Sequence, residues 1–426
     1  MALRRRLPPA LRHRDYALYW ASIVPTAFSE QMVVVAVGWQ VYAIHRSAFD
    51  LGLIGLMAFV PMPLLALPAG HLADRVPRSR VLALSYLVQL AVAALLLVVT
   101  VEGARALWPF LLLALATGAG IALGAPAGRA LSPSLVPLEL VQSAVTLRSI
   151  AFQASIVGGP ALGGALFALS PRVVYVTAAA LALVGVGCIA AVRDPVRERG
   201  EGGATLDTLL AGVRFIRSTP IILGSISLDL FAVLFGGAEA LLPLFARSIL
   251  HTGPIGLGVL RSAPAAGALL AGIVLARRPL ANRVGRTLLV AVAAFGASMV
   301  VFGLSRSLPL SCVALAVSGF ADMFSMNIRS TTVALATPDE LRGRVLAVEW
   351  VFISASNELG AFESGAAAAL LGAVTSVVAG GAITIGLAAA WTRLFPALAT
   401  VDRFDDAAPG SLRADAAGAH STGSPA

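Results

Sequence analysis

Three carboxylic acids lie deep inside long apolar stretches of the sequence. Glu30 is near the centre of the stretch 17–44, and Asp229 and Glu239 lie in 221–246, each about a third of the way from one end. An ionisable side chain in the middle of a bilayer is costly unless it is paired, hydrated or neutralised. Such an acid favours its neutral form and can exchange a proton for a cationic substrate or an arginine. The alternative, a structural acid held by hydrogen bonds or lying nearer the interface, stays open.

Charged residues recur in other apolar stretches. Arg148 and Glu349 occupy matching positions with opposite charges, where either could close a gate or satisfy a local partner. Glu363 follows Glu349 by fourteen residues, about four helical turns, and so lies on nearly the same face. With Asn357 and Glu358 nearby, that face is a candidate polar lining. Two lesser candidates complete the set: Arg261 and Asp322.

The composition decides what kind of element carries these residues. Hydrophobic residues make up 58% of the 426 residues and charged residues only 12%, and the mean hydropathy is +0.87. These values are typical of an integral membrane protein and exclude a soluble globular domain. The apolar stretches reach about 20 residues or more, which predicts helices and not the short alternating strands of a barrel. We therefore expect an all-α membrane protein.

Twelve stretches are long and apolar enough to cross a bilayer. They are 17–44, 51–73, 81–101, 107–128, 141–169, 173–192, 221–246, 255–276, 288–304, 308–330, 345–371 and 373–395. Most loop arginines follow even-numbered spans, so the positive-inside rule places both termini and the central loop in the cytoplasm. Arginines that set the membrane topology then explain the net charge of +9. We therefore expect the protein to lie in the lipid bilayer and not to bind nucleic acid.

The sequence repeats itself once. Residues 118–164 align with 319–365 at a constant offset of 201. The matched glycines are Gly118 with Gly319, Gly159 with Gly360, and Gly164 with Gly365. We predict a six-helix half at 1–192, a cytoplasmic linker at 193–219 with an amphipathic helix, a second six-helix half at 220–396, and a disordered cytoplasmic tail at 397–426. Parallel repeats are typical of secondary transporters whose substrate site lies near mid-membrane between the halves.

The sequence gives little support for metal binding, ATP hydrolysis or other enzymatic chemistry. The two cysteines, Cys188 and Cys312, and the five histidines are scattered and do not have metal-ligand spacing. No G-x-x-x-x-G-K-[ST] phosphate loop occurs, so the sequence carries no Walker-type ATPase. We expect no metal, no cofactor and no enzymatic activity.

The loop between the second and third spans carries the most specific motif. Its sequence, GHLADRVPRSR at 70–80, resembles the signature loop of the major facilitator superfamily, G-x-L-A-D-R-x-G-R-[KR], with Pro77 in place of a glycine. The matching residues are Gly70, Leu72, Ala73, Asp74, Arg75 and Arg78, with Arg80 as the final basic residue one position further along. The resemblance covers all twelve spans and implies the major facilitator fold, with twelve helices in two pseudo-symmetric six-helix bundles.

In that fold, the resemblance implies that Asp74 faces the cytoplasmic start of the eleventh span. Unpaired backbone N–H groups there, together with Arg342 and Arg344, attract a negative charge. This contact is expected to act as a conformational latch that joins the halves on the cytoplasmic side and favours the outward-open state. The second copy of the loop, LANRVGR at 280–286, has Asn282 in place of the acid, so its contact is expected to be weaker.

A glycine-rich motif lies in the fifth span. GGPALGG at 158–164 resembles the G-P-x-x-G-G core of the motif associated with antiporters of the superfamily. The matching residues are Gly159, Pro160, Gly163 and Gly164, whereas Thr146 and Ser155 stand where further glycines are expected. The motif indicates export-type gating or, equally, close helix packing through small residues. Ala114 replaces the arginine expected in the fourth span, so proton coupling must use other residues.

Two further stretches narrow the resemblance. AGRALSPSLVP at 127–137 and ELGAFESGAAAALLG at 358–372 look like the enterobactin exporter branch and its bacterial relatives. That branch implies a bacterial inner-membrane protein that exports siderophores or similar amphiphilic small molecules. We therefore expect a monomeric secondary active exporter, driven by proton exchange through alternating access. An uptake permease of the same fold, and a transporter-like sensor without net flux, are the alternatives.

Overall fold

The computed structural model describes residues 8–194 and 206–407, except for the side chains of 66, 67, 73, 74, 206–209, 339, 340, 347, 350, 354, 405 and 407. Within these residues the elements are all helical, and twelve helical segments are long and apolar enough to cross a membrane. The expected all-α fold with twelve spans is therefore confirmed.

Seven helices form the N-terminal six spans. They are α2 (Arg14–His45), α3 (Ala48–Phe59), α4 (Pro61–Arg75), α5 (Arg78–Val101), α6 (Trp108–Ser134), α7 (Val141–Leu169) and α8 (Pro171–Ala190). The second span, expected as one helix over 51–73, is divided between α3 and α4 at Val60. A proline at the first position of a helix needs no backbone N–H donor, and Pro61 accordingly begins α4.

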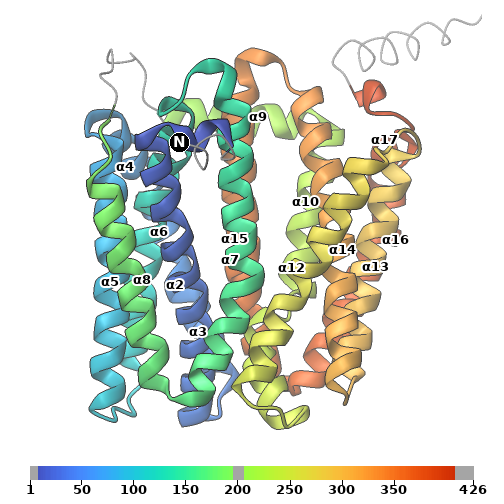
Figure 1. Ribbon diagram of the computed structural model, residues 1–426. Coiled ribbons are helices and arrows are strands. Elements are labelled where there is room, and N and C mark those ends of the chain that lie inside the picture. Colours follow the sequence, from blue (N-terminus) through green and yellow to red (C-terminus); the bar gives the residue numbers. More distant parts are fainter. Residues whose placement is uncertain (1–7, 195–205, 408–426) are drawn as a thin grey trace, which may run out of the picture.

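The remaining helices follow the central segment. They are α9 (Leu206–Ser218), α10 (Pro220–Gly236), α11 (Leu242–Leu244), α12 (Pro254–Arg277), α13 (Val284–Leu304), α14 (Leu308–Ala336), α15 (Asp339–Leu371), α16 (Ala373–Leu394) and α17 (Pro396–Thr400). The helix α9 lies at the end of the molecule that carries the N-terminus, outside the bundle of spans (Figure 1).

The seventh span is broken where a continuous helix over 221–246 was expected. After α10 the chain leaves the helix at Gly237, forms a 3-10 turn at Glu239–Leu241, and continues through α11 into a π-helix at Phe245–Ile249. The paired glycines 236 and 237 weaken the helix at this point. Ser364 Oγ donates a hydrogen bond to the Gly237 carbonyl at 2.6 Å, so the break has a side-chain partner on α15.

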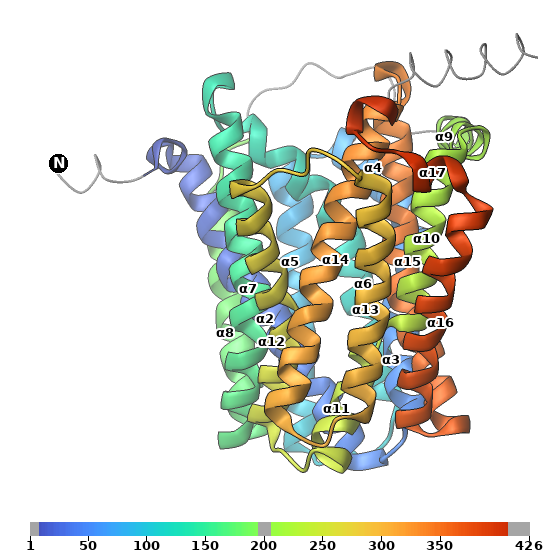
Figure 2. The same ribbon diagram turned by 90° about the vertical axis from the view of Figure 1, so that its right-hand side faces the viewer.

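The two halves pack internally in matching ways. In the N-terminal half α2 lies against α7 and α8, and α5 lies against α6 and α8; in the C-terminal half α10 packs on α15 and α16, and α13 packs on α14 and α16. Figure 1 shows the halves side by side, with α7 and α15 seen between them, and Figure 2 shows the same bundle from the side of the C-terminal half. The main packing between the halves joins α7 to α12 and α15 to α3.

Both of these joints are glycine-on-glycine contacts, which we call the glycine crossings. A Cβ placed on Gly164 of α7 would lie 3.0 Å from Gly258 Cα of α12, and one placed on Gly365 of α15 would lie 2.7 Å from Gly52 Cα of α3. Backbones can approach this closely only without side chains. The aligned glycines of the sequence repeat therefore hold the halves together near the ends of α7 and α15.

The glycine crossings lie at the end of the molecule opposite to the N-terminus. At that end, buried residues of both halves form one apolar cluster, which includes Val41 and Phe110 from one half and Phe245 and Phe302 from the other. At the N-terminal end, in contrast, each half has apolar clusters of its own. The halves are thus joined at one end of the bundle.

The C-terminal tail is ordered further than expected. Leu398 and Val401 are buried in the cluster around α13, and Gly285 N donates a hydrogen bond to Val401 O at 2.9 Å. Because these two apolar side chains cover the start of α13, the expectation of disorder from residue 397 is wrong for 397–407. Residues 408–426 lie outside the described residues.

Candidate functional site

A central cavity of about 620 Å³ lies between the two halves. Helices α2 to α7 line it from one half, and α12, α13, α14, α15 and the broken seventh span line it from the other. The lining is mainly apolar and includes three phenylalanines, Phe110, Phe152 and Phe295. A cavity of this size and character can enclose a small amphiphilic molecule.

Five charged residues line the central cavity. Four are acids and one is basic: Glu30, Glu239, Asp322, Glu358 and Arg261. Three acids predicted from the sequence therefore face the cavity, as do both lesser candidates. Only Glu30 comes from the N-terminal half, and the other four come from the broken seventh span, α12, α14 and α15.

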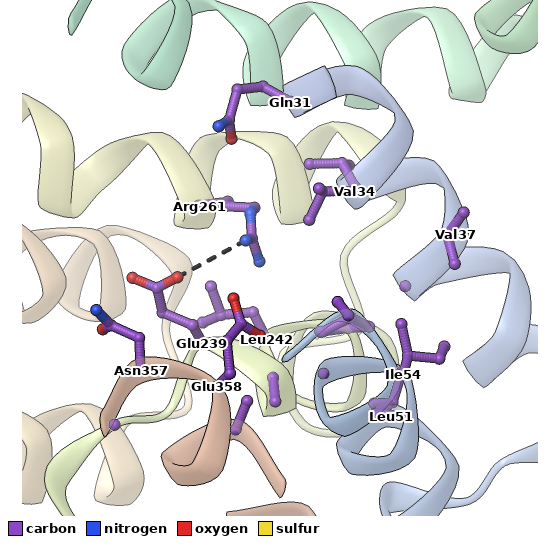
Figure 3. A pocket seen from close by; sticks show the side chains of 18 of the residues that line it. Gln31, Val34, Val37, Leu51, Ile54, Glu239, Leu242, Arg261, Asn357 and Glu358 are labelled. Atoms are coloured by element: carbon purple, nitrogen blue, oxygen red, sulfur yellow. Dashed lines mark ion pairs between the residues drawn. The ribbon is translucent and has the colours of Figure 1, made fainter. Parts of the chain in front are cut away.

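The charged side chains of the C-terminal half converge on one region of the cavity. Arg261 Nη2 lies 3.7 Å from Glu239 Oε2, and Figure 3 shows Glu358 directed toward the same space. The Glu239 side chain is 69% exposed, because the helix break places it at the cavity surface.

Glu30 on α2 faces the cavity from the N-terminal half. Its nearest hydrogen-bond donor is Gln89 Nε2 on α5, which lies 3.5 Å from Glu30 Oε2. This long contact is a weak hydrogen bond. Glu30 therefore has little local compensation, whereas Glu239 has Arg261 beside it.

Asp229 and Glu349 do not line the cavity. They lie on either side of Arg329, which the sequence analysis missed: Arg329 pairs with Asp229 through Nη1, and its Nε lies 3.4 Å from Glu349 Oε1. We call these three residues, which come from α10, α14 and α15, the ion cluster. The side chains of Arg329, Asp229 and Glu349 are only 3%, 10% and 6% exposed.

Arg329 was not predicted as a site residue because the expected end of the tenth span was wrong. The tenth span was expected to end at residue 330, which would place this arginine at the interface, where arginines are common. In the structure α14 continues to Ala336, so Arg329 lies about two turns inside the helix. The only available signal was that an arginine falls within an otherwise apolar run.

Arg148 and Glu349 have unrelated surroundings despite their matching positions. Arg148 is half-buried on α7 beside the Tyr19 hydroxyl. Tyr16 and Tyr19 donate hydrogen bonds to the carbonyls of Ala144 and Gly128, each at 2.6 Å. Arg148 thus belongs to a tyrosine cluster in the N-terminal half.

The expected polar face of the eleventh span is only partly realised. Asn357 and Glu358 line the cavity, whereas Glu349 turns to Arg329 and Glu363 is half-buried away from the cavity lining. Residues nine positions apart on a helix, such as 349 and 358, project in opposite directions. One helix therefore serves both the cavity and the ion cluster.

Two residues of the expected latch, Arg78 and Arg342, have partners within their own halves. Arg78 Nη1 donates to Ala130 O at 2.7 Å, and Arg342 Nε donates to Ala334 O at 3.1 Å. Gly70 lies in α4, while the side chains of Arg75, Arg80 and Arg344 are exposed. The Asp74 side chain lies outside the described residues, so the latch stays a prediction.

The glycine-rich motif of the fifth span lies at helix contacts. A Cβ on Gly159 would lie 2.6 Å from Gln31 Cβ, and one on Gly163 would lie 2.9 Å from Met32 Cα, both on α2. Pro160, together with Gly164, abuts Gly258 of α12. The motif therefore packs α7 against its own half and against the other.

The chain matches a known family over most of its length. The family model described as transmembrane secretion effector matches residues 7–414. The multidrug efflux pump Tap of Mycolicibacterium fortuitum is 28% identical over 355 residues, which are 78% of this chain and 84% of Tap. The enterobactin exporter EntS of Citrobacter koseri is 27% identical, over 73% of this chain and 75% of EntS.

Solved structures share the fold. A bacterial homologue of the human lysosomal transporter Spinster superposes with a TM-score of 0.71 at 17% identity, covering 91% of this chain and 98% of that chain. A D-xylose-proton symporter superposes with a TM-score of 0.68 at 12% identity, covering 91% and 99%. The twelve spans, the family match and these relatives agree: the chain belongs to the transmembrane secretion effector family of the major facilitator superfamily and is a multi-pass membrane transporter, not an enzyme.

Proposed function

We propose that this transporter exports a small amphiphilic molecule from the cytoplasm in exchange for protons, by alternating access. The observation that carries the proposal is the central cavity, which both halves line and into which acids of both halves project. A substrate bound there would be released on either side as the halves rock about it.

The packing of the halves gives the proposed cycle its starting state. If the N-terminal end is cytoplasmic, as the loop arginines predict, the glycine crossings close the outer side and the structure is inward-open. Outward opening then requires the crossings to separate and a cytoplasmic contact to form. The latch of Asp74 with Arg342 and Arg344 is the proposed cytoplasmic contact.

The direction of transport is proposed from the relatives. Tap is a multidrug efflux pump and EntS is an enterobactin exporter. We propose the same direction for this chain, at the bacterial inner membrane and as a monomer. Uptake through the same fold and ligand binding without net flux are the alternatives, and the transport experiment below separates them.

The charge of the cavity favours a cationic substrate. Four acids against one arginine make the lining acidic when the acids are ionised, and the three phenylalanines offer ring faces that attract organic cations. An anionic siderophore would meet repulsion from Glu239 and Glu358. Of the two substrate types expected from the sequence, the drug-like amphiphile is therefore favoured over the siderophore.

A matched pair of probes tests the cationic substrate. Tetraphenylphosphonium and tetraphenylborate have nearly the same shape and opposite charges, and their binding to the protein in lipid nanodiscs can be measured by equilibrium dialysis. We expect the cation to bind more tightly, and we expect Glu358→Gln to weaken its binding about tenfold, the effect of losing ~1.4 kcal/mol. Glu102→Gln, at the exposed end of α5, is the control variant. Equal binding of both probes would contradict the cationic substrate.

Transport itself is tested in proteoliposomes with an acidic interior and ethidium outside. Accumulation of ethidium that collapses when the pH gradient is removed supports proton-coupled transport. Binding without accumulation would favour the sensor, and accumulation only under the reversed gradient would favour uptake.

A further inference from the structure

The ion cluster contains more acid than base. Arginine side chains carry a positive charge in proteins, and Arg329 is the cation between the carboxyl groups of Asp229 and Glu349. Within the described residues, Glu349 Oε1 has no hydrogen-bond partner beyond this ion pair. One guanidinium balances one carboxylate, and a second uncompensated carboxylate in a buried site costs several kcal/mol. The cluster is therefore balanced when one of its two carboxyl groups holds a proton.

Among the residues that the structure describes, no second cation forms an ion pair with the carboxylates of the cluster. Asp322 on α14 interacts electrostatically with Asp229 and Arg329, and it is also acidic. The described ionisable side chains on the helices packed around α10, α14 and α15 are exposed, beside the cavity or paired elsewhere, and they include Arg214, Arg217, Arg277, Arg286, Arg342, Arg344, Arg393, Arg261, Glu239 and Asp50. The charge balance within the cluster thus depends on Arg329.

The cluster is separate from the substrate cavity but shares two helices with it. Helix α15 carries Glu349 in the cluster, Glu358 in the cavity lining and Gly365 at a glycine crossing. Helix α14 carries Arg329 in the cluster and Asp322 in the lining. If the pairing of Arg329 changes, α15 can move relative to α10. Because the helices are continuous, that movement would reach the cavity lining and the glycine crossing.

We propose that Asp229, Arg329 and Glu349 form the proton-binding site of the transporter, apart from the substrate site. One proton binds to a carboxylate of the pair to give a carboxylic acid, and Arg329 then pairs with the other carboxylate alone. Loss of that proton to the opposite side of the membrane restores the shared arrangement. Each cycle thus moves one proton in and out of the cluster without contact between proton site and substrate. This inference rests on the proposed function in one respect, the exchange of substrate for protons.

The test separates gradient-driven transport from passive exchange. Glu349→Gln and Asp229→Asn each remove one acid and leave Arg329 with a single partner, so the cluster stays balanced with no titrating proton. In proteoliposomes with an acidic interior, both variants are expected to lose ethidium accumulation down to the level of empty liposomes. Exchange of external for internal ethidium at equal pH is expected to continue at a rate near that of the wild type, and to lose the pH dependence of the wild type.

The results that would contradict a proton site at the ion cluster differ from those that would contradict the proposed function. Accumulation by both variants at the wild-type level would show that the cluster carries no transported proton. Loss of exchange together with accumulation in both variants would assign the cluster a structural role. A wild type that does not respond to the pH gradient would contradict proton exchange altogether, and the inference with it. Glu102→Gln is again the control, and thermal unfolding in detergent identifies any variant that fails to fold.

Discussion

The two halves place different chemistry at matching positions of one scaffold. In the repeat alignment Gly128 matches Arg329, and Arg148 matches Glu349. In the N-terminal half, the carbonyl of Gly128 accepts the hydrogen bond of Tyr19, and Arg148 lies beside that tyrosine. In the C-terminal half, the same place holds the ion cluster.

The same difference extends to the central cavity. Ile121 on α6 and Asp322 on α14 match in the repeat and both line the cavity. Val157 on α7 matches Glu358 on α15, of which only Glu358 is a lining residue. The glycine crossings, in contrast, are alike in both halves. The duplicated scaffold thus keeps the contacts that join the halves and concentrates buried charge in one half.

The largest effect that tests this comparison is expected from removal of the central arginine. Arg329→Met leaves two buried carboxylates without a cation, which we expect to destabilise the protein by about 3–5 kcal/mol. Arg148→Met, at the matching end of the N-terminal half, is expected to cost only about 1 kcal/mol, the ordinary effect of a substitution. Thermal unfolding in detergent measures both.

A triple variant shows whether charge is the cause. Asp229→Asn and Glu349→Gln, added to Arg329→Met, remove every charge of the cluster, and we expect most of the stability to return. Similar losses for Arg329→Met and Arg148→Met would remove the asymmetry between the halves.

The next largest effect is expected at the glycine crossings, where the halves are alike. Gly164→Val and Gly365→Val each force side-chain atoms against the backbone of the other half, at a cost of about 1–3 kcal/mol. Both are expected to shift the population toward the outward-open state. Pulsed electron paramagnetic resonance spectroscopy measures this shift as a change in the distances between spin labels on the outer loops.

The control for the crossings is Gly187→Val on α8, where a Cβ would meet nothing within 4 Å. A shift caused by only one of the two crossing variants would show that the joints are not equivalent.

The smallest effect is expected from the latch. Asp74→Asn removes a charge proposed to face the start of α15, a contact worth about 0.3–1 kcal/mol, so the inward-open population should rise and transport should fall while membrane insertion is kept. Asn282→Asp in the second copy of the loop is expected to act in the opposite sense. The same spin-label distances apply, and an unchanged population with wild-type turnover in Asp74→Asn would eliminate the latch.

Much of this architecture was predictable from the sequence. Hydropathy sets the number of spans because the backbone in lipid must form helices, and the repeat alignment finds Gly164 and Gly365, which the structure places at both crossings. Glu30, Glu239 and Glu358 were identified because a carboxyl group is rare in an apolar span.

The sequence could not predict which charged residues form ion pairs or toward which side of a helix each side chain projects. Period and spacing do not reveal that α15 turns Glu349 away from the cavity and Glu358 toward it, because helix rotation is set by packing. Arg329 was hidden by a span boundary that only the helix end at Ala336 corrects. At the break, Gly237 accepts a hydrogen bond from Ser364, a partner far along the chain that the sequence does not reveal.

The central claim is that the proton site lies in the C-terminal half and its counterpart in the N-terminal half does not couple. The most direct measurement is the ratio of pH-driven ethidium accumulation to ethidium exchange at equal pH, compared between Glu349→Gln and Arg148→Gln. We expect this ratio to fall to the level of empty liposomes in Glu349→Gln and to keep its wild-type value in Arg148→Gln. A wild-type ratio in Glu349→Gln, or a collapse in Arg148→Gln instead, would contradict it.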